Sequence, residues 1–308
     1  MQQRLERHVS SLPEHADPRH PTSNTHHVSF DVTLDGHMMQ PIHTHPVRSA
    51  VLLVFAGMTL LVLGDMAVSS LADASSASLY RSLLRFSLGA AILVSLTRAG
   101  WGREAGVTQL APTGKKAWGI AFLPLSFYLV ANVSGLDGSL HMTPGAFLDW
   151  VSMNLAVGLV EEALYRGFAL FILLKAWGST RRGLVLACIV QALLFGPFHL
   201  LNLLSGESLG AVLPNAVFAT IVGVAFGAAY AYSGSLWTCV VLHALIDMAG
   251  SANEAMGIVE HVPEKSFSLS TFLPSLLVLV VVSLLPSLWF AYRSDLRPRT
   301  SAAASREA

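Results

Sequence analysis

Eight apolar runs of about 20 residues dominate the chain from Val47 onward, and that is the length a helix needs to cross a bilayer. Only 12% of the 308 residues are charged and 53% are hydrophobic, whereas globular domains carry about 25% charged residues. The sequence therefore predicts an all-α, polytopic membrane helix bundle with about eight transmembrane helices. We place the predicted spans at residues 48–68, 80–98, 117–133, 145–177, 183–204, 209–231, 235–250 and 271–292.

The fourth run, residues 145–177, exceeds one perpendicular span. It predicts either a steeply tilted helix or a turn at the membrane interface around residues 147–150. Asp65 and Arg85, near the ends of the first two spans, are interpreted as packing polar groups without a function.

Basic residues predict how the spans are oriented, because cytoplasmic loops are enriched in Lys and Arg. Fifteen of them fall on one side of an eight-span arrangement: Arg4, Arg7, Arg19, Arg48, Arg98, Arg103, Lys115, Lys116, Lys175, Arg181, Arg182, Arg293, Arg297, Arg299 and Arg306. The opposite loops contribute only Lys265. Both termini are therefore expected to be cytoplasmic, in a bacterial cytoplasmic membrane. The net charge of zero gives no support to a nucleic-acid partner.

The composition divides the chain into five predicted regions. Residues 1–46 are polar, contain eight of the twelve histidines and five prolines, and are expected to form a disordered tail. A start of translation at Met38 or Met39 is an alternative that the sequence leaves open. The remaining regions are N-terminal transmembrane helices at 47–144, a core at 145–250, an extracytoplasmic loop with the last helix at 251–292, and a basic cytoplasmic tail at 293–308.

Ionisable side chains interrupt three predicted spans far from their ends, where each charge costs about 2.5 to 3.5 kcal/mol on insertion scales. The fourth span carries Glu161, Glu162 and Arg166 within GLVEEALYRGF. The fifth contains FGPFH, residues 195–199, and the seventh contains HALID, residues 243–247. Within each motif, residues four apart share one face of the helix.

The three groups are expected at similar depths. At a rise of about 1.5 Å per residue, Glu161 lies about 21 Å from Lys175, His199 about 26 Å from Arg182, and Asp247 about 18 Å from Ser235. The sequence therefore predicts one polar layer near the middle of the bilayer, with a kink at Gly196 and Pro197 that opens it.

The two glutamates cannot share a role, because adjacent helix residues point about 100° apart. Glu162 shares a face with Arg166 and is the natural partner for an ion pair. Glu161 has no such partner, so it is expected to face a neighbouring helix or a water-filled cavity and to serve as a general base. His243 and Asp247 leave three alternatives open: the carboxylate holds the imidazole in one tautomer, both bind a metal, or the pair only anchors neighbouring helices.

Taken together, these motifs resemble the CPBP family of intramembrane proteases, which includes the CAAX prenyl endopeptidases and the bacterial Abi proteins. The family pattern is Glu-Glu-x-x-x-Arg, then Phe-x-x-x-His, then His-x-x-x-Asn or Asp, on successive core helices. Here these motifs stand at residues 161–166, 195–199 and 243–247, in order and on separate predicted spans.

The resemblance implies a peptidase and a role for each residue. Glu161 and His199 would activate a water. His243 and Asp247 would stabilise the oxyanion or orient the site. Glu162 and Arg166 would stabilise the arrangement of the site, with Phe195 beside them. Position 247 is Asp where many members have Asn, and an ionised Asp cannot donate to an oxyanion. The substrate would be a peptide or protein, lipidated or otherwise bound to the lipid bilayer.

The sequence leaves two alternatives open, a metal-dependent site and a metal-free site. His199, His243 and Asp247 could supply three ligands to a divalent ion such as zinc, with Glu161 as the base. A metal-free site in which Glu161 and His199 act together fits the spacing equally well. Two further readings compete with the protease: a proton- or ion-coupled transporter that uses the same groups as a relay, and a catalytically inactive immunity or scaffold protein.

Overall fold

The structure is a computed structural model, and it describes residues 44–73, 76–110, 115–134, 142–257 and 268–293. The predicted disordered tail therefore lies outside the described residues except for its last three positions. The basic C-terminal tail from residue 294 and most of the loop around Lys265 also lie outside them.

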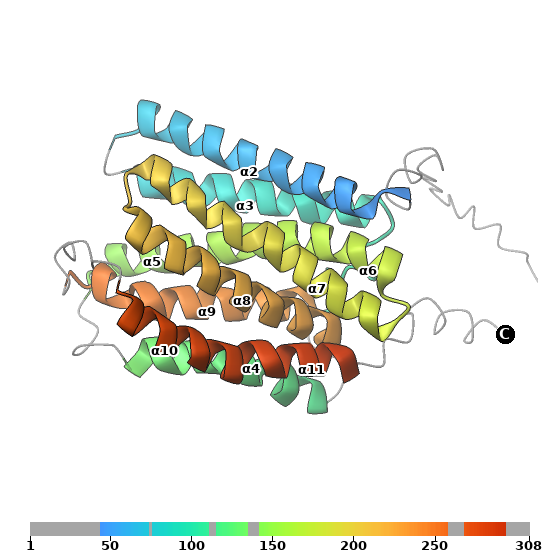
Figure 1. Cartoon of the computed structure of the whole chain (residues 1–308). Helices are drawn as coiled ribbons and strands as arrows, with labels where there is room; N and C mark the ends of the chain where they lie inside the picture. Colours follow the sequence, from blue (N-terminus) through green and yellow to red (C-terminus); the bar gives the residue numbers. More distant parts are fainter. Residues whose placement is uncertain (1–43, 74–75, 111–114, 135–141, 258–267, 294–308) are drawn as a thin grey trace, which may run out of the picture. The chain divides into compact units, whose positions relative to one another are not determined.

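Helices account for nearly all of the described residues, which contain no strand (Figure 1). They are α2 (Pro46–Leu71), α3 (Ala77–Arg98), α4 (Lys115–Ser134), α5 (Pro144–Glu162), η1 (Ala163–Leu170), α6 (Phe171–Trp177), α7 (Arg181–Phe195), η2 (Gly196–Ser205), α8 (Leu209–Ser233), α9 (Leu236–Ala255), α10 (Leu269–Leu279), η3 (Val280–Leu284) and α11 (Leu285–Arg293). Where consecutive elements join end to end they form eight helical segments in the described ranges, and these coincide closely with the eight predicted spans. The all-α fold is confirmed.

Five of these segments are long and apolar enough to cross a membrane: Pro46–Leu71, Ala77–Arg98, Arg181–Ser205, Leu209–Ser233 and Leu269–Arg293. α2 leaves large apolar side chains such as Leu52, Phe55 and Leu60 more than half exposed, as expected for a surface that contacts lipid rather than water. Two of the other three segments, Pro144–Trp177 and α9, carry the buried ionisable groups.

Local sequence explains where the central helices begin. Thr143 accepts a hydrogen bond from the Ala146 amide at the start of α5, with Pro144 in the first turn. Ser235 does the same for the Thr238 amide at the start of α9. Gly234, just before it, ends α8 with a φ of 71°, a conformation that glycine adopts without a steric penalty.

The long fourth segment is one continuous helix from Pro144 to Trp177, so the predicted alternative of a turn at residues 147–150 is wrong. Its middle, Ala163–Leu170, widens into a π-helix immediately after the two glutamates. π-helical turns recur at functional sites because the extra residue re-aims the side chains around it. Here the widened turn holds Arg166.

The fourth segment lies at the centre of the bundle. α5 packs between α3 and α9, while η1 contacts α2, α3 and α7 (Figure 1). α8 packs against α7, η2, α4 and α11. Each helix that carries a predicted site residue therefore contacts another helix that also carries one.

Gly158 lets α5 and α9 approach closely. A Cβ at this position would lie 3.0 Å from the Val240 carbonyl oxygen and 3.2 Å from the Ala244 amide nitrogen. Both are backbone atoms of α9, which cannot move aside as a flexible side chain could.

We therefore expect Gly158→Ala to force α5 and α9 apart and to lower the free energy of unfolding by about 1 to 3 kcal/mol, the usual cost of overpacking. Gly145→Ala on the same helix is the matched control, because a Cβ there meets nothing within 4 Å. Chemical denaturation in mixed micelles measures both. Equal stabilities of the two variants would contradict the close approach.

Candidate active site

The predicted ion pair between Glu162 and Arg166 is present and fully buried. Arg166 Nη1 lies 2.8 Å from Glu162 Oε1, and neither side chain is exposed. The guanidinium carbon of Arg166 also lies 4.9 Å from the ring centroids of both Phe195 and Phe226, within range of a cation–π interaction. Pairing and aromatic contact together offset the cost of burying the charge.

Glu162 also contacts His243 across the interface of α5 and α9. His243 Nδ1 lies 2.6 Å from Glu162 Oε1, the same oxygen that accepts from Arg166. An ionised carboxylate can only accept, so Nδ1 must be the donor, and the imidazole is held in one orientation. Sequence reasoning had offered Asp247 for this role and missed Glu162, which lies 81 positions away along the chain.

The other ring nitrogen of His243 faces two further carboxylates. Nε2 lies 3.4 Å from Asp247 Oδ2 and 3.6 Å from Glu161 Oε2. The ring stacks on Phe226 at a centroid distance of 5.2 Å and meets the edge of Phe195 at 6.2 Å. The side chain is only 8% exposed, whereas those of Glu161 and Asp247 are 23% and 32% exposed. The two carboxylates are therefore the more accessible groups.

Glu161 faces a cavity, as its position relative to Glu162 predicted. It lines a cavity of about 1010 Å³ between α2, α3 and η2, together with His199 and Tyr165. Its Oε2 atom has no hydrogen-bond partner among the described residues. Glu161 is thus a partly exposed carboxylate that can accept a proton from a water, whereas Glu162 is fully buried and its Oε1 atom already has two partners.

His199 lies where α7 tightens into the 3₁₀-helical η2, directly after Gly196 and Pro197. The sequence predicted a local break there. A Cβ at Gly196 would collide with Thr220 and with the Ala216 carbonyl of α8, so glycine is needed for this packing. The His199 ring meets Phe195 edge-on at a centroid distance of 5.1 Å, and its Nδ1 atom has no hydrogen-bond partner among the described residues.

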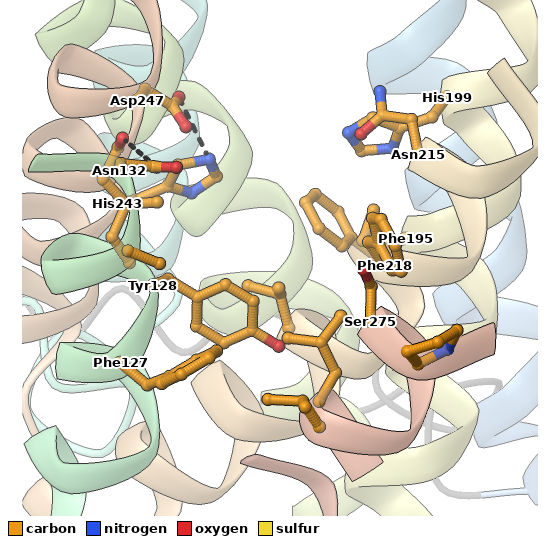
Figure 2. Close-up of a pocket in the computed structure, with 17 residues that line it drawn as sticks. Phe127, Tyr128, Asn132, Phe195, His199, Asn215, Phe218, His243, Asp247 and Ser275 are labelled. Carbon is orange, nitrogen blue, oxygen red and sulfur yellow. Dashed lines mark hydrogen bonds and ion pairs between the residues drawn. The ribbon is translucent and has the colours of Figure 1, made fainter. Parts of the chain in front are cut away.

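His199 also lines a second cavity, of about 590 Å³, between α4, α8, α9 and α10. Figure 2 shows His199 and Asn215 on one wall of this cavity and His243 and Asp247 on the other. Its remaining lining is mostly apolar and aromatic, with Phe127, Tyr128 and Phe218. His199 therefore connects the cavity of Glu161 with the cavity of His243 and Asp247.

The proposed metal ligands do not form a compact set in this arrangement. His199 faces His243 and Asp247 across the second cavity (Figure 2). Within the described parts of the chain, no three His, Cys, Asp or Glu side chains are grouped closely enough to hold one ion. The described His, Asp and Glu side chains as placed therefore do not fit a single zinc ion.

Comparison with known protein families matches residues 143–249 to a family described as Rce1-like, type II CAAX prenyl endopeptidase Rce1-like. The matched range starts at the capping residue of α5 and ends within α9. It contains all seven residues singled out in the sequence, from Glu161 to Asp247. No curated protein and no solved structure gives a significant match to the chain.

Proposed function

Residues 143–249 belong to the CPBP family of membrane proteases, to which the CAAX prenyl endopeptidases also belong, and on that premise we propose that this chain is an intramembrane endopeptidase in which Glu161 and His199 activate water. The family and the long apolar helices make the chain an integral membrane protein of a protease family.

The different surroundings of the two glutamates are the observation that supports this proposal. Glu162 is buried and already accepts from Arg166 and His243, so it orients the site. Glu161 lines a cavity of about 1010 Å³ that it shares with His199, and its side chain is partly exposed. The Oε2 atoms of both glutamates lack a hydrogen-bond partner among the described residues, but that of Glu162 belongs to a fully buried side chain. A base must be free to accept a proton from the attacking water, and Glu161 is the carboxylate that meets this requirement.

In the proposed reaction, Glu161 takes a proton from a water held between it and His199. The resulting hydroxide attacks the carbonyl carbon of the scissile peptide bond. His243 in its protonated form then donates from Nε2 to the oxyanion, because Glu162 holds the ring with Nδ1 turned away. When the C–N bond breaks, the proton on Glu161 passes to the departing amine.

Asp247 acts on His243 rather than on the substrate in this proposal. An ionised carboxylate cannot donate to an oxyanion, and Asp247 Oδ2 lies 3.4 Å from His243 Nε2. Its negative charge therefore stabilises the imidazolium form of His243, whose Nε2–H group is the oxyanion donor.

The test is peptide cleavage by the purified protein in liposomes, followed by mass spectrometry on a panel of prenylated and unmodified peptides. We expect cleavage by the wild type, loss of it in His199→Gln, and an unchanged rate in the presence of EDTA or phenanthroline. Cleavage that the chelators abolish and zinc restores would overturn the metal-free mechanism. A pH-sensitive dye inside the same liposomes tests the transporter alternative. Proton flux without cleavage of any peptide would contradict the proposal that the protein is a protease.

A further inference from the structure

Asn215 is a polar side chain in the second cavity that the proposed mechanism does not use. It lies in the second turn of α8, a helix with a mean hydropathy of 2.0 that is apolar enough to cross a membrane. The hydroxyl of Thr220, on the same helix, donates to the Ala216 carbonyl oxygen at 2.8 Å. Asn215 makes no hydrogen bond with any described residue, and it is exposed. A polar group without a partner in an apolar span is costly, so it indicates a function.

The packing of η2 on α8 places Asn215 beside His199. A Cβ at Gly196 would lie 2.7 Å from the Ala216 carbonyl oxygen, so the two helices approach closely at this point. Gly196 precedes His199 by three positions, and Ala216 directly follows Asn215. Figure 2 shows the side chains of Asn215 and His199 on one wall, facing His243 across the cavity. A substrate peptide that reaches both histidines therefore passes the Asn215 carboxamide.

A peptide in this cavity needs hydrogen-bond partners for its backbone. Each peptide group carries an N–H donor and a C=O acceptor, and burying them without partners is unfavourable. The cavity wall is mostly apolar and aromatic, with rings such as those of Phe127 and Phe218. The Asn132 amide, also in this wall, already donates to the Ile246 carbonyl oxygen at 3.1 Å. The Asn215 carboxamide therefore offers the cavity two N–H donors and one acceptor that the fold does not use.

We propose that Asn215 binds the backbone of the substrate at the peptide group next to the cleaved bond. The inference rests on the proposed peptidase function and deepens it. We assign the neighbouring peptide group because His199, which lies beside Asn215, holds the attacking water in the proposed mechanism. The Asn215 carbonyl oxygen accepts from the N–H of that group, and the Asn215 NH₂ donates to its C=O. Because every residue except proline offers this N–H, the contact fixes the register of the substrate without recognising its side chains.

Asn215 is thus a substrate-binding residue and not a donor to the oxyanion. In the proposed mechanism the oxyanion accepts from His243 Nε2, and His243 lies on the opposite wall (Figure 2). A hydrogen bond to a peptide group that does not react is equally strong in the ground state and the transition state. Its loss therefore raises KM and leaves kcat unchanged. Loss of an oxyanion donor would lower kcat instead, because that bond strengthens only in the transition state.

The experiment takes one peptide of the panel and replaces each peptide group except the cleaved one, in turn, by an ester. An ester has no N–H, so it removes the bond to the Asn215 carbonyl oxygen at a single position. We expect one ester, next to the cleaved bond, to raise the KM of the wild type about threefold to tenfold, the effect of one hydrogen bond. In Asn215→Leu, the parent peptide and this ester should differ by less than about twofold. Thr220→Val is the matched control: the Thr220 hydroxyl bonds within α8, so this variant should keep the full difference.

Binding measurements keep this inference separate from the proposed function. In the background of Glu161→Gln, the same ester should bind about threefold to tenfold more weakly than the parent peptide, and adding Asn215→Leu should remove that difference. Equal binding of the parent peptide and every ester would overturn the role of Asn215, whatever the rate of cleavage. A fall in kcat that Asn215→Leu shows equally with all the peptides would assign Asn215 to the oxyanion and would overturn it too. Failure of the proposed function has a different signature: the wild type cleaves no peptide, although one ester still binds more weakly than its parent.

Discussion

Glu161→Gln is expected to lower kcat by about a hundredfold to ten-thousandfold, the range that a positioned general base contributes. The amide keeps the size of the side chain but cannot take a proton from water. Folding should be unaffected, because the Glu161 side chain is partly exposed and its Oε2 atom has no hydrogen-bond partner among the described residues. Steady-state cleavage kinetics in liposomes, beside thermal unfolding in detergent, measure both quantities.

Glu162→Gln is the matched control, since it makes the same chemical change at the adjacent position. There the lost charge leaves Arg166 buried without its partner and changes the acceptor of His243 Nδ1. We expect this variant to lose stability as well as activity, whereas Glu161→Gln loses activity alone. The assignment of the two glutamates is wrong if Glu161→Gln cleaves at the wild-type rate, or if it unfolds as readily as Glu162→Gln.

The contrast between these two residues also shows what could be predicted from the sequence. The ion pair of Glu162 with Arg166 depends only on positions four apart along one helix, and helical periodicity predicts it directly. The same periodicity turns Glu161 away from that pair, toward the cavity where the structure places it. Apolar run lengths likewise predict the eight helical segments, because bilayer thickness sets their length.

The contact between Glu162 and His243 could not be predicted in this way. It requires α5 and α9 to approach closely, which depends on Gly158 meeting the backbone of Val240 and Ala244. Periodicity within a helix carries no information about which faces of two distant helices meet. For the same reason, the sequence interpretation of Asp65 and Arg85 as packing polar groups did not predict that they share a cavity with Glu161.

Arg166→Leu is expected to lower the free energy of unfolding by about 3 to 5 kcal/mol, the usual cost of removing one partner of a buried ion pair. Both side chains are fully buried, so the Glu162 carboxylate would remain in an apolar core without its cation. Lys175→Leu is the control: it breaks the Lys175–Glu104 pair, whose side chains are 24% and 35% exposed, and should cost at most about 1 kcal/mol. Chemical denaturation in mixed micelles gives both values.

The double variant Arg166→Leu with Glu162→Leu separates stability from catalysis. Replacing both members of a buried pair with apolar residues is often neutral, so most of the stability lost in Arg166→Leu should return. Activity should not return, because His243 Nδ1 would have lost the Glu162 oxygen that orients the ring. If the double variant regains both stability and cleavage, the pair only supports the fold and His243 needs no orientation by Glu162. If it regains stability alone, the buried charge of Glu162 is retained to orient His243, at a cost that Arg166 offsets.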